Sequence, residues 1–340
     1  MRPSRVLRIA VAVGLTAIIL WHADPRAVLS TAARADPWWI LAAVLLVFVD
    51  RALMAWRWMD LLCALTPGSR PPFPAVLRTF FVSTFVGSFL PSIGGDAYRA
   101  YSLSRHDVRL SESAASVLMD RVLGVLAIAF VGALAVALNP QAGVGRAIVV
   151  PLACAAAACA VVAAAVFSDR AAALAQTMAA RLPWRTARRA GSALTEAMGR
   201  YSNHHVELVR VLVASAGVQA IRVVQAYCLG RALAIDVPLG TYFLLIPVVL
   251  LVMLLPITVS GLGTSQVAFQ YLFGQSGVPA PQAVALSILF VALGVVGNLP
   301  GSLLYAFDAD RPFDQPQGRP LDQAQGSTRD DSTSPPERRR

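Results

Sequence analysis

Long apolar runs separated by short polar segments fill most of the sequence. A helix needs about 20 apolar residues to cross a hydrocarbon core about 30 Å thick. Six runs approach or exceed that length and predict full transmembrane helices at residues 6–21, 38–59, 113–138, 147–167, 206–233 and 281–307. The sequence therefore predicts an all-α polytopic membrane protein over residues 1–308. Residues 309–340 are polar and proline-rich, and we expect this tail to be disordered.

Two further apolar runs are interrupted by a Leu-Pro pair and a glycine-rich turn. Residues 79–90 lead into LPSIGGD (residues 90–96), and residues 242–255 lead into LPITVSGLG (residues 255–263). The first run is too short to cross the membrane, and both regions predict re-entrant hairpins. A full span over residues 242–273 stays open as an alternative. The same pattern in both halves is typical of an inverted repeat.

The composition supports a lipid environment and gives an orientation. Only 14% of the residues are charged, against roughly 25% in soluble proteins. The net charge is +10 without a single lysine, and this use of arginine alone favours a GC-rich bacterial genome. Residues 168–205 carry six arginines against two acidic residues, which predicts a basic cytoplasmic loop. Counting spans from it predicts a multi-pass protein of the bacterial inner membrane with both termini in the cytoplasm.

Motifs for soluble chemistry are missing from the sequence. We find no nucleophile–base pair, no phosphate-binding loop, no zinc spacing and no dinucleotide fingerprint. The arginines are not interleaved with aromatic residues as in a nucleic-acid interface. We therefore expect no enzymatic activity, no cofactor, no metal and no nucleic-acid partner.

The two glycine-rich turns are the candidate substrate site. Backbone that leaves helical geometry at membrane depth must be buried in protein or line a cavity. A short helix that starts there points free N–H groups and a positive dipole end at an anion, for which a lipid phosphate is the natural candidate. The glycines concerned are Gly94, Gly95, Gly261 and Gly263, and Ser260 adjoins the second pair. The alternative is that these glycines only permit close helix packing.

Two polar residues follow the first turn. We expect Asp96 to cap a short helix over residues 97–104, with contact to substrate or a cation as the alternative. Arg99, in the first turn of that helix, would either form a charge-assisted fork with a phosphate or extend to the membrane interface.

Charged residues inside predicted spans complete the candidate set. Asp50-Arg51, Asp120-Arg121 and Arg222 each cost about 2.5–3.5 kcal/mol at a helix centre, so each needs a partner or a wet cavity. We take Asp120, Arg121 and Arg222 as candidate substrate contacts. For Arg222, a purely structural bridge to Asp50 or Asp120 is the alternative.

Three segments resemble the transmembrane domain of the lysylphosphatidylglycerol synthase and flippase family. They are residues 89–105 (FLPSIGGDAYRAYSLSR), 114–121 (AASVLMDR) and 255–263. The resemblance implies a domain that moves aminoacylated or glycosylated lipids between leaflets. Members that synthesise lysyl-lipid also carry a cytoplasmic transferase domain, so we do not expect synthesis by this chain. Gln266 stands where the family often has a glutamate, and the last span is apolar around Phe290 where the family often has an arginine; both leave the substrate open.

Three functions are compatible with these observations. The leading one is a flippase-like transporter of an anionic, aminoacylated or glycosylated lipid or polylipid, whose phosphate headgroup lies between the hairpins. The alternative is an accessory subunit that presents lipid to a separate glycosyl- or aminoacyl-transferase, which would be its protein partner. A third is a membrane-embedded transferase with Asp96 or Asp120 as base. The sequence gives no oligomeric state.

Overall fold

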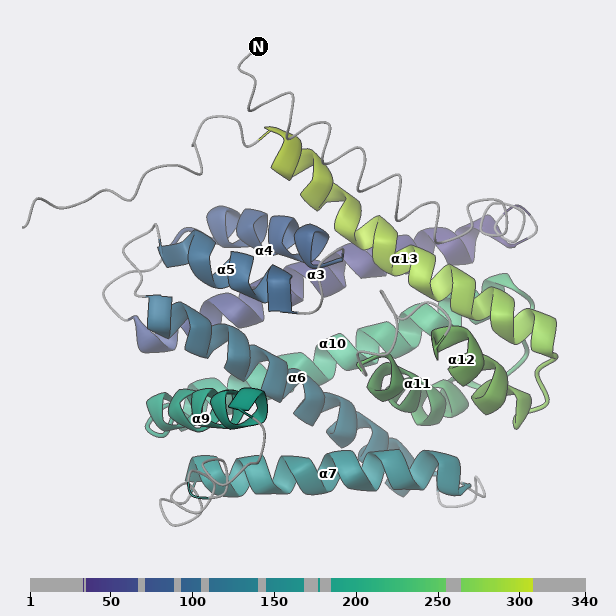
Figure 1. Ribbon diagram of the computed structural model, residues 1–340. Helices are drawn as coiled ribbons and strands as arrows, with labels where there is room; N and C mark the ends of the chain where they lie inside the picture. Colours follow the sequence, from purple (N-terminus) through teal and green to yellow (C-terminus); the bar gives the residue numbers. More distant parts are fainter. Residues whose placement is uncertain are drawn as a thin grey trace, which may run out of the picture. The chain divides into compact units, whose positions relative to one another are not determined.

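The computed structural model describes residues 33, 35–66, 71–88, 93–104, 110–139, 145–167, 177, 185–254 and 264–307 (Figure 1). Their regular elements are all helices: α3 (Pro37–Leu65), α4 (Phe73–Gly87), α5 (Ile93–Ser104), α6 (Leu110–Leu138), α7 (Arg146–Phe167), α9 (Arg185–Arg200), α10 (His205–Ala232), α11 (Leu239–Met253), α12 (Thr264–Gly274) and α13 (Ala280–Phe307). The predicted all-α fold is confirmed. The first predicted span, the second glycine-rich turn and the tail lie outside the described residues.

Five of the predicted full spans correspond to long helices. Among the described residues, α3, α6 and α13 are long and apolar enough to cross a membrane, by length and composition. The helix α7 matches the predicted span 147–167 and is apolar over Ile148–Ala158. The helix α10 has 28 residues and includes the charged residues Glu207, Arg210, Arg222 and Arg231. Part of the predicted basic loop, Arg185–Arg200, is itself helical.

The helix α3 has one face for lipid and one for the protein. Its exposed apolar residues recur every three or four positions and form a stripe: Trp38, Leu41, Leu45, Phe48 and Val49. Ala43, Val47 and Asp50 are buried on the other side. An apolar outer face is what a lipid environment selects, and it explains how α3 can bury a carboxylate while remaining apolar outside.

The helices α3 and α10 form an antiparallel pair whose register is marked by polar contacts (Figure 1). Four contacts follow one another along the pair: the Asp36 amide with the Ala232 carbonyl, Arg222 with Asp50, Arg57 with Ser215, and Arg210 with Asp60. The residue number rises along α3 as it falls along α10 in each pair. The polar residues within these apolar helices therefore face each other, which spares them the cost of facing lipid.

The helices α4 and α5 form the first hairpin. A Cβ on Gly95 would lie 2.7 Å from the Gly87 Cα and 2.7 Å from the Ser83 carbonyl oxygen, so only glycine allows the two helices to approach this closely. Nearer the open end of the hairpin, Arg99 Nε donates to Ser83 Oγ at 3.3 Å. The contacts establish an antiparallel pair of short helices, as the re-entrant prediction requires.

The start of α5 corrects part of the sequence prediction. The helix begins at Ile93 rather than near Ala97, so Gly94, Gly95 and Asp96 lie in its first turn. The prediction of Asp96 as N-cap is wrong, and Arg99 lies in the second turn. Glycine costs roughly 1 kcal/mol in a helix relative to alanine. The close contact between Gly95 and α4 forms only if Gly95 is part of the helix, and this contact favours the earlier start.

The helices α11 and α12 form the second hairpin, whose open end is marked by aromatic rings. The Tyr242 and Phe273 rings lie 5.1 Å apart, near the start of α11 and the end of α12. Tyr242 also contacts Tyr227 of α10 at 5.4 Å, and Tyr227 contacts Trp39 of α3 at 6.2 Å. The open end of this hairpin therefore lies at the Pro37 end of α3.

The two hairpins enter from opposite ends of α3. In the first, Phe73 and Leu77 of α4 pack in the cluster that includes Met59 and Leu62, near the Leu65 end of α3. The second opens at the Pro37 end, as the aromatic rings show. This opposite orientation is the arrangement that an inverted repeat produces.

The first hairpin reaches the middle of α3. Asn298 of α13 donates to Ser88 Oγ, one residue beyond α4, at 3.0 Å. A Cβ on the adjacent Gly297 would lie 3.2 Å from Arg51 Nε. Arg51 is the middle residue of α3, about 21 Å from either end at 1.5 Å per residue.

The second hairpin reaches a similar depth from the other side. A Cβ on Gly240 would lie 3.4 Å from Asn139 Oδ1, and one on Gly132 would lie 3.2 Å from Pro247 Cβ. The helices α11 and α6 are therefore antiparallel, and the same register brings Leu254, just after α11, level with Val125, next to Gly124. Gly124 in turn faces Arg57 of α3. The described inner ends of α4 and α11, at Gly87 and Met253, thus both lie in the central part of the bundle.

Candidate functional site

Two arginines and one aspartate form a buried cluster between α3, α5 and α6. One oxygen of Asp120 lies 2.7 Å from Arg57 Nη2, and the other lies 3.5 Å from Arg99 Nη1. Arg57 Nη1 also donates to Ser215 Oγ of α10 at 2.8 Å. The three charged residues are 3–6% exposed. We call Arg57, Arg99 and Asp120 the Asp120 cluster.

Aromatic rings hold Arg99 in this cluster. Its guanidinium carbon lies 5.0 Å from the Trp58 ring centroid and 4.7 Å from that of Phe80. The Trp58 indole donates to Ser116 Oγ at 3.2 Å, which fixes the ring. A planar guanidinium between aromatic faces is held by cation–π attraction as well as by its ion pair. The alternative in which Arg99 extends to the membrane interface is therefore wrong.

A second ion pair joins the same two helices. Arg121 of α6 donates from Nε and Nη2 to the two oxygens of Asp96 of α5, both at 3.0 Å. These side chains are more open to the surroundings than the Asp120 cluster, at 51% exposed for Arg121 and 24% for Asp96. The first hairpin is thus joined to α6 by two neighbouring ion pairs, one buried and one partly exposed.

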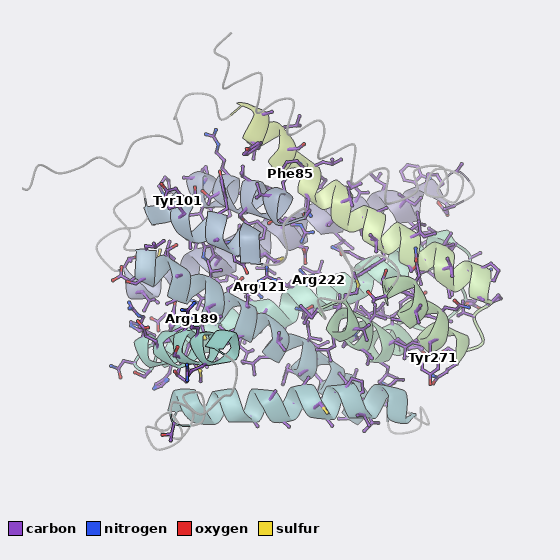
Figure 2. All side chains as sticks on the ribbon, in the orientation of Figure 1. Phe85, Tyr101, Arg121, Arg189, Arg222 and Tyr271 are labelled. Atoms are coloured by element: carbon purple, nitrogen blue, oxygen red, sulfur yellow. The ribbon has the colours of Figure 1, made fainter. Side chains whose placement is uncertain are left out.

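Another cluster of two arginines and one aspartate lies between α3 and α10. Asp50 is 1% exposed, and its two oxygens lie 3.0 Å from Arg51 Nη1 and 3.2 Å from Arg222 Nε. Both arginines also contact Met54 Sδ, at 3.6 and 3.1 Å. We call Asp50, Arg51 and Arg222 the Asp50 cluster. Figure 2 labels Arg222 on α10 and Arg121 on α6.

Each cluster has an excess of positive charge. In the described part of the chain, the aspartate of each cluster is paired with two arginines. The arginines of the Asp50 cluster have no second carboxylate among the described residues. The attraction of one carboxylate does not offset the desolvation of two guanidinium groups. An anion bound at either cluster would balance the remaining charge, and a phosphate is the anion that arginine binds with the best geometry.

Several buried polar atoms near the clusters have no hydrogen-bond partner among the described residues. They include the Nε atoms of Arg51 and Arg57 and, on α10, Gln219 Oε1 and Gln225 Nε2. Gln219 and Gln225 stand one turn on either side of Arg222, and both are buried. Buried polar atoms are rarely left unsatisfied in proteins, so these positions call for water or a ligand.

A buried tyrosine lies just outside α10, beside α3. The Tyr201 hydroxyl donates to the Leu61 carbonyl oxygen at 2.8 Å. Burial, with a smaller contribution from the Asp120 charge, raises the pKa of Tyr201 above its ordinary value of 10.0. The phenol therefore remains a neutral donor and adds no negative charge to balance the arginines.

The structure brings together only some of the predicted site residues. Asp96, Arg99, Asp120 and Arg121 meet where the first hairpin contacts α6, and Arg222 belongs to the separate Asp50 cluster. Of its two predicted bridging partners, the structure selects Asp50. Gln266, in the first turn of α12, is half-buried. Ser260, Gly261 and Gly263 lie outside the described residues.

Gly95 has a structural role. The space beside it is filled by the Gly87 backbone and the Ser83 carbonyl oxygen. The packing alternative therefore accounts for Gly95, and phosphate contact at its backbone is not needed to explain the glycine.

The predicted site residues did not include Arg57 or Arg51. Arg57 lies near the end of the predicted span 38–59, but α3 continues to Leu65 and Arg57 is buried. Asp50 and Arg57 are seven residues apart and so lie on the same helix face, and this spacing was the available signal. Within the described residues, no group of three or more His, Cys, Asp or Glu side chains forms a metal site.

Comparison with known families finds a match. The model of the lysylphosphatidylglycerol synthase TM region matches residues 5–301, which is most of the chain. The chain belongs to this family. A search of curated proteins finds no match. The resemblance found in three short segments is thus confirmed over the transmembrane region as a whole.

Membership in this family, with the apolar helices, shows a multi-pass membrane protein with a lipid-related role. The family match includes both hairpins and all residues of the two arginine clusters. The hairpins and the two clusters therefore belong to the region that the chain shares with this family.

Proposed function

We propose that this protein is a flippase-like transporter that moves an anionic, aminoacylated or glycosylated lipid between the two leaflets. One observation carries the proposal: two hairpins enter the bundle from opposite ends, and the inner ends of α4 and α11 lie at the depth of two arginine-rich clusters with excess positive charge. A transporter needs a headgroup site near the bilayer midplane that can open to either side. The positions of the hairpins and clusters support this proposal.

The arginines address the main barrier to lipid movement. A phosphodiester loses its hydration when it leaves the interface, and an unpaired charge at the bilayer centre is very costly. Two guanidinium groups that share one carboxylate retain enough positive charge to replace that hydration by charge-assisted hydrogen bonds. The acyl chains remain in the hydrocarbon region, so only the headgroup requires a polar route.

In this proposal the first hairpin moves relative to α6, and the ion pairs between α5 and α6 break. The pairs Asp96–Arg121 and Arg99–Asp120 hold the first hairpin against α6. If the hairpin moves away, Arg99 and Arg121 lose their carboxylate partners and become available to the headgroup phosphate. The headgroup would then take the place of the carboxylates, and no covalent step is required.

A proteoliposome assay tests the transport proposal. Fluorescent phosphatidylglycerol is placed in both leaflets, and a membrane-impermeant reductant quenches the probe in the outer leaflet only. Transport makes nearly all of the probe accessible, whereas protein-free vesicles protect about half. Fluorescent phosphatidylcholine is the matched control, because its headgroup carries no net charge. Protection of half the phosphatidylglycerol in the presence of folded protein would contradict transport and favour the accessory role.

A further inference from the structure

The Asp50 cluster has features that its pairing with α10 does not explain. A single arginine would satisfy the buried carboxylate of Asp50, yet Arg51 and Arg222 both contact it. Arg51 Nε is buried without a hydrogen-bond partner among the described residues. A bridge built only to join two helices would need neither the second arginine nor the free donor.

The surroundings of this cluster also favour a ligand. Gln225 is 4% exposed, its Nε2 has no described partner, and it lies one turn from Arg222 on α10. On the other side, α13 packs directly against Arg51 at Gly297, where a Cβ would lie 3.2 Å from Arg51 Nε. The site therefore combines excess positive charge with unsatisfied donors.

The two clusters lie along one line on α3. Asp50 and Arg57 are separated by two helical turns, about 10 Å. Arg57 is nearer the Leu65 end, where the first hairpin opens, and Arg51 is at the middle of the helix. A headgroup that enters beside the first hairpin would meet the Asp120 cluster first and the Asp50 cluster next.

We infer that the Asp50 cluster is a second binding site for a phosphate-class anion, placed deeper in the bundle than the Asp120 cluster. That a transported lipid phosphate reaches this site after the Asp120 cluster rests on the proposed function. Binding of the anion itself is independent of that function. Arg51 and Arg222 bind the phosphate oxygens, and the carboxylate of Asp50 competes with the phosphate for the two guanidinium groups. Splitting the path into two steps of about 10 Å keeps the phosphate paired with arginine as it moves.

Charge substitutions distinguish a binding site from a structural bridge by the direction in which they change the affinity for the anion. Arg222→Gln removes the excess positive charge, and Asp50→Asn increases it. An anion site requires Arg222→Gln to weaken binding, by about tenfold for one charged hydrogen-bonding group, and Asp50→Asn to strengthen it. A structural bridge requires both substitutions to lower thermal stability without opposite effects on binding. Arg51→Gln is the second neutralising variant and should act like Arg222→Gln.

The measurement is the ligand-dependent thermal shift of the purified full chain in detergent, with dioctanoylphosphatidylglycerol as the probe. Dioctanoylglycerol, which lacks phosphate, controls for the acyl chains, and inorganic phosphate shows whether a free anion binds as well as a lipid headgroup. Arg210→Gln is the matched control, because Arg210 pairs with Asp60 on the same two helices but is 51% exposed. Its affinity should equal that of the wild type.

The outcomes separate this inference from the transport proposal. Opposite changes in affinity for Asp50→Asn and Arg222→Gln support the site, even if the wild type does not move lipid in vesicles. Affinities that are unchanged, or lowered equally, in both variants overturn the site, even if the wild type transports phosphatidylglycerol. A shift with lipid alone identifies a headgroup site, and a shift with inorganic phosphate as well extends it to soluble anions.

Discussion

Arg222 of α10 contacts Asp50 of α3 at 3.2 Å, although 172 residues separate them in the chain. This contact aligns two membrane helices and places two opposite charges near the middle of the bundle. Removing one partner of a buried ion pair typically costs 3–5 kcal/mol, because the other charge stays buried.

We expect Arg222→Leu to destabilise the protein by about 3 kcal/mol, at the low end of that range because Arg51 still pairs with Asp50. The loss would be measured as a lower midpoint of thermal unfolding in detergent. Arg210→Leu, which breaks an exposed pair on the same two helices, should cost no more than about 1 kcal/mol. Equal losses of stability in the two variants would mean that burial does not strengthen the pair between Arg222 and Asp50.

Arg99 is expected to need more than its charge. Arg99→Lys keeps the positive charge but loses the planar group that lies between Trp58 and Phe80, and it loses the Nε bond to Ser83. We expect a loss of about 1–2 kcal/mol in the free energy of unfolding. Arg188→Lys on the exposed surface of α9 is the control. A lysine variant as stable as the wild type would show that ring stacking contributes nothing.

Gly95 is expected to tolerate no side chain. In Gly95→Ala, the new Cβ would lie 2.7 Å from atoms of α4, so the hairpin must separate. We expect a loss of about 1–3 kcal/mol from overpacking. Gly294→Ala in α13 has open space around the new Cβ and should be neutral or stabilising by up to about 1 kcal/mol. Unfolding midpoints that fall equally in the two variants would contradict the packing role of Gly95.

The orientation remains a prediction from the arginine distribution and can be tested by labelling. In a background with the four native cysteines changed to serine, single cysteines would be placed at Ser202, Ser276 and Ser332. An impermeant thiol reagent added to intact spheroplasts should label Ser276→Cys only, because the other two positions are predicted to be cytoplasmic. Labelling of Ser332→Cys from outside would mean that the second hairpin or the last helix crosses the membrane differently.

The sequence was sufficient to predict the apolar helices, because a lipid solvent makes their length and composition decisive. It also predicted both hairpins, since a Leu-Pro pair and glycines interrupt otherwise apolar runs. The start of α5 was missed because glycine disfavours an isolated helix, and only the contact between Gly95 and Gly87 makes the earlier start favourable.

The pairing of charged residues was harder to predict. Asp50, Asp120 and Arg222 stood out because charge is rare inside apolar runs. Arg57 did not stand out. It lies six residues beyond the middle of α3, so in the sequence it resembled a residue at the end of a span. Its burial depends on α6 and α10, which bring Asp120 and Ser215 to it from distant parts of the chain. Such long-range contacts leave no local pattern in the sequence.

Transport through the bundle is most directly tested by a reversible lock on the first hairpin. Cysteines would replace Asp96 and Arg121 in the cysteine-free background, and a short bis-methanethiosulfonate reagent would join α5 to α6. We expect the unlinked variant, which keeps Arg99 but lacks Arg121, to move fluorescent phosphatidylglycerol in proteoliposomes more slowly than the wild type. We expect the linked variant to lose that movement and a thiol reductant to restore it. Equal rates of phosphatidylglycerol movement in the linked and unlinked protein would contradict a path for lipid that opens beside this hairpin.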